Sequence, residues 1–291
     1  MTFLAPRRFL SAMRRSRTIG PVSVGRALSI ILALGAGSAL LAACNAQQKA
    51  PGSDGGAPAR DGLTFDIPPI VDGSAAGYAL SFDGDNEYAT AGDAGFAPVG
   101  SPQTLEMWIN YAAASGTQDF LVLRTDFESG VQLGIHDGAL AAWRVYTDRV
   151  LVQAPTTPPA GAWHHVAYSY DGTTHLLYLD GAQVDSQTVP SDDRTPTSAW
   201  LGTDGSGNLY KGLMDEVRVW SLTRTAAQVA ADMAHTPAGA QTGLVAYWTF
   251  DDAINGGSSI DLSGSGNTVT LGDGVASLMP SRVPSTAPVG N

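Results

Sequence analysis

The chain has 291 residues, with 16 Lys or Arg and 27 Asp or Glu, so its formal net charge is −11 at pH 7. Residues 1–43 hold six of the Arg and no acid, which leaves residues 44–291 with a formal charge of −17. Such an acidic surface repels nucleic acid and anionic lipid headgroups, which excludes both as partners, and it favours cations such as Ca²⁺. The single Cys excludes a disulfide within the chain.

Residues 1–43 have the layout of a secretory signal, in which a basic segment precedes a short apolar run. The sequence Leu41-Ala42-Ala43-Cys44 resembles the bacterial lipobox, where small residues precede a cysteine that becomes lipid-modified. The alternative is a transmembrane anchor with Cys44 incidental, but an apolar run of about 17 residues is at the lower limit for crossing a bilayer. We therefore expect removal of residues 1–43 and a lipid anchor on Cys44.

A tether, a folded domain and a tail are expected to follow. Residues 44–62 form the expected tether, because Asn45 to Asp61 include no aromatic or branched aliphatic residue. The folded domain is expected over 63–279, and the Pro- and Ser-rich segment 280–291 is expected to be a loose tail. Asn45 stands where many Gram-negative lipoproteins retained in the inner membrane have Asp, which favours the outer membrane or the cell surface.

Between tether and tail, short apolar segments alternate with turns rich in Gly, Asp, Asn and Pro, a pattern typical of β-strands. Twelve strands are expected, near 78–82, 87–90, 103–111, 120–125, 131–136, 140–146, 163–170, 175–179, 183–189, 199–202, 212–220 and 244–250. One helix is expected over 226–234, with Thr225 as N-cap and Gln228 completing a capping box. This order predicts an all-β sandwich of two antiparallel sheets with one short helix.

Three segments occur in a recognisable order: 79–88 (ALSFDGDNEY), 163–181 (beginning WHHVAYSYDG) and 212–220 (GLMDEVRVW), the last followed by the helix and by 243–251. Together they resemble the laminin-G-like jelly-roll domains of the concanavalin A-like lectin/glucanase superfamily, over about residues 75–275. The resemblance implies a jelly-roll sandwich. It leaves function open, because relatives bind glycans, bind proteins or accompany catalytic domains. Many relatives carry a disulfide that this chain lacks.

The acidic residues lack the spacing of a glycosidase active site. Glucanases of the superfamily place two Glu and one Asp at alternate positions of one strand, so that an acid and a nucleophile flank the glycosidic bond. This chain has four Glu, at 87, 106, 128 and 216, and no two of them lie within five residues. His164 and His165 point to opposite faces of a strand and are expected to be structural rather than zinc ligands. The sequence therefore predicts a protein that is not an enzyme, with a cryptic carbohydrate-active enzyme as a distant alternative.

A structural Ca²⁺ site is expected at Asp83, Asp85 and Asp215. Asp83 and Asp85 offer carboxylate oxygens on a turn, which suits Ca²⁺. Strand alternation places Asp215 on the apolar face of its strand, where a buried carboxylate needs a cation or several hydrogen bonds. The resemblance implies that these two strands lie close together. The alternative is that Asp215 caps backbone amides and Asp83 shapes a turn. Glu216 and Arg218 share the other face and are able to pair.

A ligand-binding patch is expected where polar side chains alternate with apolar ones on two neighbouring strands. If Val131, Leu133, Ile135, Trp143 and Val145 face the core, the outward side chains are Gln132, His136, Arg144 and Tyr146. An aromatic ring beside planar hydrogen-bonding groups suits a sugar, although an ordinary polar sheet face has the same pattern. The other Trp residues, at 108, 163, 200, 220 and 248, are expected to pack inside the fold.

These observations predict a non-catalytic, membrane-tethered module of the bacterial envelope that recognises a glycan. The acidic surface favours a neutral or cationic glycan over a sulfated one. The alternative is a protein-binding adhesion or structural component of the envelope.

Overall fold

The computed structural model describes residues 77–92, 95–125, 130–145, 147, 149–190, 195–252 and 256–289. The expected signal, the lipid-bearing Cys44, the tether and Tyr146 of the expected ligand patch lie outside these residues.

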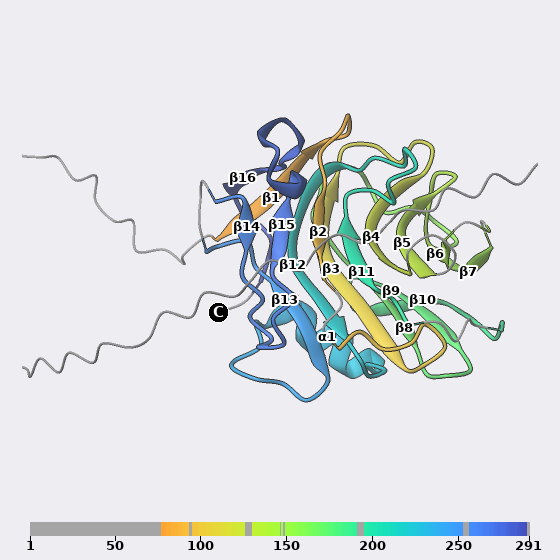
Figure 1. Cartoon of the computed structure of the whole chain (residues 1–291). Helices are drawn as coiled ribbons and strands as arrows, with labels where there is room; N and C mark the ends of the chain where they lie inside the picture. Colours follow the sequence, from red (N-terminus) through yellow and green to blue (C-terminus); the bar gives the residue numbers. More distant parts are fainter. Residues whose placement is uncertain are drawn as a thin grey trace, which may run out of the picture. The chain divides into compact units, whose positions relative to one another are not determined.

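The described residues form two antiparallel sheets (Figure 1). The first has the order β10-β9-β8-β3-β12-β1-β16, with β13 also paired to β12, and the second has the order β14-β15-β2-β11-β4-β5-β6-β7. The strands of the first sheet are β1 (Tyr78–Asp83), β3 (Gln103–Tyr111), β8 (His164–Tyr170), β9 (His175–Leu179), β10 (Ala182–Gln187), β12 (Lys211–Trp220), β13 (Leu244–Trp248) and β16 (Ser281–Pro284). Those of the second are β2 (Ala89–Ala91), β4 (Gln118–Arg124), β5 (Gly130–His136), β6 (Ala139–Arg144), β7 (Val150–Gln153), β11 (Ser198–Leu201), β14 (Ser258–Ser259) and β15 (Val269–Leu271). The predicted jelly-roll sandwich with one helix is confirmed.

The core lies between the two sheets, because alternate residues of each strand face the opposite sheet. In β5 the inward side chains are Val131, Leu133 and Ile135, and all three are fully buried. Tyr168 and Trp248 of the first sheet belong to the same buried cluster. The core is thus large enough for the domain to fold without a disulfide.

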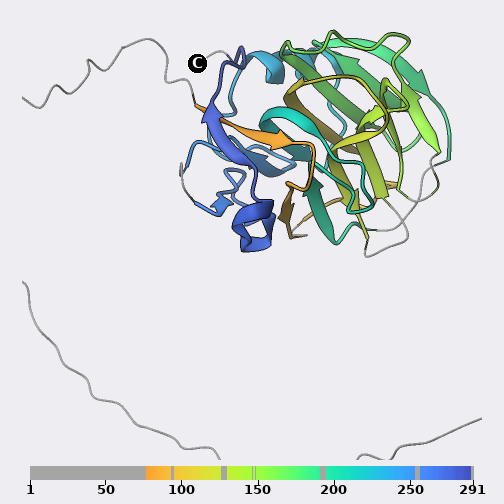
Figure 2. The same cartoon turned by 90° about the horizontal axis from the view of Figure 1, so that it is seen from above.

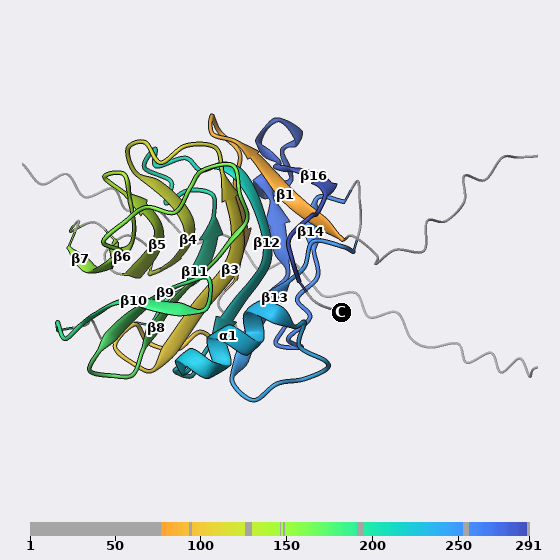
Figure 3. The ribbon, with the colours of Figure 1, turned by 180° about the vertical axis from the view of Figure 1, so that it is seen from behind.

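Helix α1 (Ala226–Ala234) covers part of the outer face of the first sheet, as Figure 3 shows. Thr225 and Gln228 form the expected capping box at its start. Val229 is the buried residue of the helix and packs against Ala167 and Tyr178. The helix therefore encloses side chains that would otherwise point from the sheet into solvent. Among the described residues, no helix is long and apolar enough to span a membrane.

The C-terminal segment is part of the sandwich. The expectation of a loose tail over 280–291 is wrong as far as the chain is described, because β16 pairs with β1 along Tyr78–Ser81. Figure 2 shows this blue strand beside the orange first strand. Beyond it, the Ser285 hydroxyl donates to Asp215 at 2.5 Å, and the Trp163 indole donates to Thr286 at 3.0 Å. A segment with few apolar residues is held here by backbone pairing and hydroxyl hydrogen bonds.

A β-bulge divides β12. Its register with β3 shifts between Asp215 and Arg218, and Glu216 has a φ of 53°. The extra residue resets the alternation of side chains. Asp215 therefore lies opposite Trp108, whereas Val217 joins the core. The prediction that Asp215 shares the core face is wrong, because that prediction assumed an unbroken strand.

Candidate functional site

A groove opens on the outer face of the second sheet, where β15, β2, β11 and β4 lie side by side. Its volume is about 420 Å³. The lining residues are Thr90, Ala91, Gly92, Arg124, Thr197, Ser198, Trp200, Thr268, Thr270 and Asp273. Half of these residues carry a hydroxyl group, and one of them, Trp200, supplies a large aromatic ring. Such a lining offers many hydrogen-bonding groups and one apolar platform.

Trp200 reaches this groove because of strand alternation. Its neighbours Ala199 and Leu201 are fully buried in the core, so Trp200 points to the other face of β11. The expectation that Trp200 packs inside the fold is wrong. The alternation in Ser198-Ala199-Trp200-Leu201 would have revealed the outward position, because a small residue and a Leu flank the Trp at core-facing positions.

The ring of Trp200 is held in place by its neighbours. The Tyr88 ring stacks on it with a centroid separation of 5.5 Å and an interplanar angle of 19°. The Arg124 guanidinium lies 4.1 Å from its centroid, a cation–π contact. Its indole N–H donates to the Ser198 hydroxyl at 3.2 Å. The half-buried ring is therefore fixed before any ligand arrives.

Asp273 forms the opposite side of the groove. It lies in a turn with a φ of 48°, and its carboxylate accepts hydrogen bonds from the Tyr88 hydroxyl at 2.9 Å and from the Thr90 hydroxyl at 2.8 Å. The groove thus combines an aromatic ring, a guanidinium, a carboxylate and hydroxyl groups. This set can bind a polyhydroxylated ligand by hydrogen bonding and by contact with the ring.

Two buried carboxyl groups, Asp119 and Asp204, lie beside the groove. The Gln132 amide donates to both, at 3.1 Å to Asp119 and 3.3 Å to Asp204, and Arg124 donates to the backbone carbonyl of Asp204. Burial, together with the negative charge of Asp204, holds the pKa of Asp119 well above its usual range. Asp119 Oδ2 is buried without a hydrogen-bond partner among the described residues. A proton or a cation is needed to relieve this pair.

Residues 83–230 match the family Laminin_G_3, of the concanavalin A-like lectin/glucanases superfamily. This chain belongs to that family. The resemblance stated from the sequence is confirmed.

Solved structures resemble the laminin-G-like domain at low sequence identity. A proposed carbohydrate-binding protein from Bacteroides ovatus has a TM-score of 0.55 and 21% identity, over 74% of this chain and 62% of its own, so this chain spans less than two thirds of it. Domain 4 of an extracellular arabinanase from Geobacillus stearothermophilus, solved with arabinotriose, has a TM-score of 0.45 and 21% identity, over 53% of this chain and 75% of its own. A heptameric SAP-like pentraxin from Limulus polyphemus has a TM-score of 0.44 and 15% identity, over 54% of this chain and 82% of its own. No curated protein sequence matches.

Of the ligand patch expected on β5 and β6 of the laminin-G-like domain, Gln132 and Arg144 do not share a face. Gln132 lies opposite Trp143, so these two share a face, whereas Arg144 lies opposite the core residue Val131. Gln132 is 2% exposed, and Arg144 donates to the carbonyl of Pro190 at 2.7 Å. The prediction assigned Trp143 to the core because it is apolar. Leu140 and Ala142 are the inward residues of β6, so the alternation is displaced by one residue.

The acids expected to share Ca²⁺ are not brought together. Asp83 and Asp85 lie in one turn, where the Asp85 amide donates to Asp83 at 2.8 Å. Asp83 pairs with Lys211 in the ladder between β1 and β12, four residues before Asp215 on β12. Asp215 accepts from the Glu216 amide and from Ser285, and burial raises its pKa to about 8. Among the described residues, no three His, Cys, Asp or Glu side chains form a group suited to a metal.

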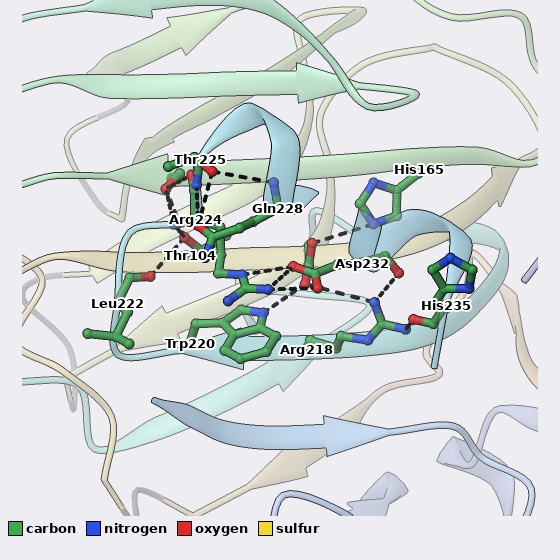
Figure 4. Close-up of polar contacts among 12 residues, drawn as sticks. Thr104, His165, Arg218, Trp220, Leu222, Arg224, Thr225, Gln228, Asp232 and His235 are labelled. Carbon is green, nitrogen blue, oxygen red and sulfur yellow. Dashed lines mark hydrogen bonds and ion pairs between the residues drawn. The ribbon is translucent and has the colours of Figure 1, made fainter. Parts of the chain in front are cut away.

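A separate ionic network lies between the first sheet and α1 (Figure 4). Arg218 pairs with Glu216 at 2.5 Å, as expected, and donates to the backbone carbonyl of Asp232 in α1. Glu106 accepts from the Trp220 indole at 2.7 Å, and burial raises its pKa to about 7. Its other oxygen lies 3.6 Å from the ring of His165, whose pKa burial lowers to about 3. Through Arg218 the network anchors the helix to the sheet, and His165 lies at its buried end beside Glu106.

Proposed function

We propose that this laminin-G-like domain is a non-catalytic module that binds a glycan in the groove around Trp200. The observation that carries the proposal is the fixed, half-buried Trp200 ring bordered by Arg124, Asp273 and hydroxyl side chains. A sugar presents both apolar C–H faces and hydroxyl groups, and this lining complements both. The Bacteroides ovatus neighbour, itself a proposed carbohydrate-binding protein, supports the same assignment at the level of fold.

The ligand class follows from the charges on the groove. Arg124 and Asp273 supply one positive and one negative group, so the groove itself does not select a strongly charged sugar. The formal charge of residues 44–291, −17, disfavours sulfated or phosphorylated polymers at longer range. We therefore infer a neutral polysaccharide or surface glycoconjugate as ligand, bound through a short stretch of sugar units.

A glycan array probed with residues 63–291 tests the proposal. The wild-type domain should bind a related set of neutral glycans, and Trp200→Ala should lose that binding while Trp163→Ala keeps it. Trp163 is the matched control, because it is also partly buried but lies outside the groove. Equal binding by both variants would show that the glycan does not bind in the Trp200 groove. A folded wild-type domain that binds no glycan would favour the protein-binding or structural role.

We also propose that the module is held on the bacterial envelope, at the outer membrane or cell surface, by lipid on Cys44. The support is the sequence Leu41-Ala42-Ala43-Cys44 after an apolar run, together with a following segment suited to a tether. A tethered module without catalytic residues fits a role in holding a polymer near the cell.

For the predicted structural Ca²⁺, we propose Asp119 and Asp204 as ligands in place of Asp83, Asp85 and Asp215. Their buried carboxylates and the orphaned Asp119 Oδ2 fit a hard cation. A bound Ca²⁺ would neutralise the pair and fix the loop after β11 beside Trp200, so it would order one wall of the groove.

A further inference from the structure

The segment that follows β14 has an inverted pattern of burial. Ser259, Asp261 and Ser263 point inward and are at most 8% exposed. Ile260 and Leu262 point outward and are 56% and 50% exposed. The inward acid has a structural reason, because Asp261 accepts hydrogen bonds from backbone amides, including that of Tyr247 at 3.0 Å. The outward pair of large aliphatic side chains has no such reason within the fold.

The two aliphatic side chains line a pocket of about 420 Å³ that is distinct from the Trp200 groove. The other lining residues are Glu216, Thr236, Pro237, Tyr247, Thr249, Asp251 and Asp252. The lining of the pocket therefore combines apolar and acidic side chains. This combination is suited to a ligand with an apolar stem and a cationic end.

Glu216 is the acid of this pocket that is best placed to receive a cation. It is 6% exposed, and its Oε2 accepts from Arg218 at 2.5 Å and from the Tyr247 hydroxyl at 2.6 Å. No hydrogen bond between described residues reaches Oε1. Asp251 adds a second, exposed carboxylate, which among the described residues accepts a hydrogen bond from the Tyr78 amide alone. Asp252 differs, because it is already paired with Arg282 at 3.3 Å.

We propose that this pocket binds a lysine side chain presented by a partner protein. The ammonium group lies between Glu216 Oε1 and Asp251, and the methylene stem lies along Ile260 and Leu262. Lysine fits better than arginine, because Glu216 has one oxygen left and cannot accept the paired hydrogen bonds of a guanidinium. A protein fits better than a sugar, because two half-exposed aliphatic side chains need an apolar surface to cover them.

Methyl NMR of Ile260 and Leu262 in residues 63–291 tests this site. The probe is the peptide acetyl-Gly-Leu-Lys-Leu-Gly-amide, and the control is the same peptide with acetyl-lysine. The lysine peptide should shift both methyl resonances in a saturable manner. The acetylated peptide should bind about tenfold more weakly or worse, since it lacks the charge that the carboxylates recognise. Equal affinity for the two peptides, or no binding of either, would overturn the proposal.

Two variants distinguish binding in the pocket from non-specific attraction to the acidic surface. Leu262→Lys places an ammonium group of the chain itself in the pocket that Glu216 and Asp251 line, and it should abolish binding of the lysine peptide. Val275→Lys is the matched control. Val275 is 49% exposed and lies outside the pocket, and its substitution changes the net charge by the same amount. Equal loss in both variants would indicate non-specific charge attraction and overturn the proposal. Glucosamine competing as well as the lysine peptide would do so too, because the ligand would then be an amino sugar.

Discussion

Glu106 is a buried acid whose charge opposes folding. Burial raises its pKa from 4.5 to about 7, so the folded protein holds a proton that the unfolded chain has already released between these two values. Its contribution to the free energy of unfolding is therefore greatest at acid pH and is lost as the pH rises from about 4.5 to 7.

Glu106→Gln should remove this dependence, because the amide can still accept the hydrogen bond from Trp220 without carrying a charge. We expect urea unfolding to show that the free energy of unfolding of the wild type falls between pH 5 and pH 8 by about 2 kcal/mol more than that of the variant. One pKa unit corresponds to about 1.4 kcal/mol. Parallel losses in the two proteins would show that Glu106 titrates near its ordinary pKa.

Asp119 provides the test for bound calcium. If Asp119 and Asp204 hold Ca²⁺, the melting temperature should rise with Ca²⁺ and fall with chelator, because a ligand of the native state stabilises it by about 2.7 kcal/mol at a hundredfold excess over Kd. Asp119→Asn should abolish the response, whereas Asp85→Asn should retain it. The reverse pattern would indicate that Ca²⁺ binds at the turn after β1, which holds Asp85. An unchanged melting temperature in wild type would indicate that a proton, and not Ca²⁺, removes the charge repulsion between Asp119 and Asp204.

The aromatic residues show how much of the site follows from the sequence. Strand alternation was sufficient to predict which β5 residues face the core, because Val131, Leu133 and Ile135 all agree. It was misapplied to Trp143 and Trp200, because a large apolar side chain was taken to mean the core. In both strands the smaller neighbours occupy the core, and the Trp lies on the opposite face.

At the level of elements, β4 and β5 approach each other closely at Gly134. A Cβ on Gly134 would lie 2.1 Å from the backbone oxygen of Gln118, which cannot move without disturbing the strand pair. Gly134→Ala should therefore lower the free energy of unfolding by about 1–3 kcal/mol, measured by urea unfolding. Gly92→Ala is the control, because no atom of the described residues, its chain neighbours aside, lies within 4 Å of its added Cβ. Equal stability of the two variants would contradict the tight β4–β5 contact.

Elements with strong local signals were predicted well, and elements that depend on distant contacts were not. The helix 226–234 was predicted residue for residue, because its capping box lies within the helix itself. The short strands β7, β14, β15 and β16 were missed, since pairing with distant strands holds them more than their own sequence does. The bulge at Glu216 was missed for the same reason, and the position of Asp215 with it.

At the scale of the whole molecule, the proposed attachment to the envelope depends on one atom, the Cys44 sulfur. Cys44→Ala removes the only thiol of the chain, so the protein should leave the membrane fraction or keep its first 43 residues. Fractionation and mass spectrometry in a bacterial host check both outcomes. Cys44→Ala protein that is cleaved and membrane-bound like wild type would contradict the lipid anchor.

A glycan bound by this laminin-G-like domain should contact the Trp200 ring in its groove. The most direct measurement is the indole N–H spectrum of residues 63–291, titrated with the oligosaccharide selected by the array. We predict a saturable shift of the Trp200 indole N–H resonance, with the resonances of the buried indoles of Trp143, Trp220 and Trp248 unchanged. Saturable binding that leaves the Trp200 resonance in place would contradict it.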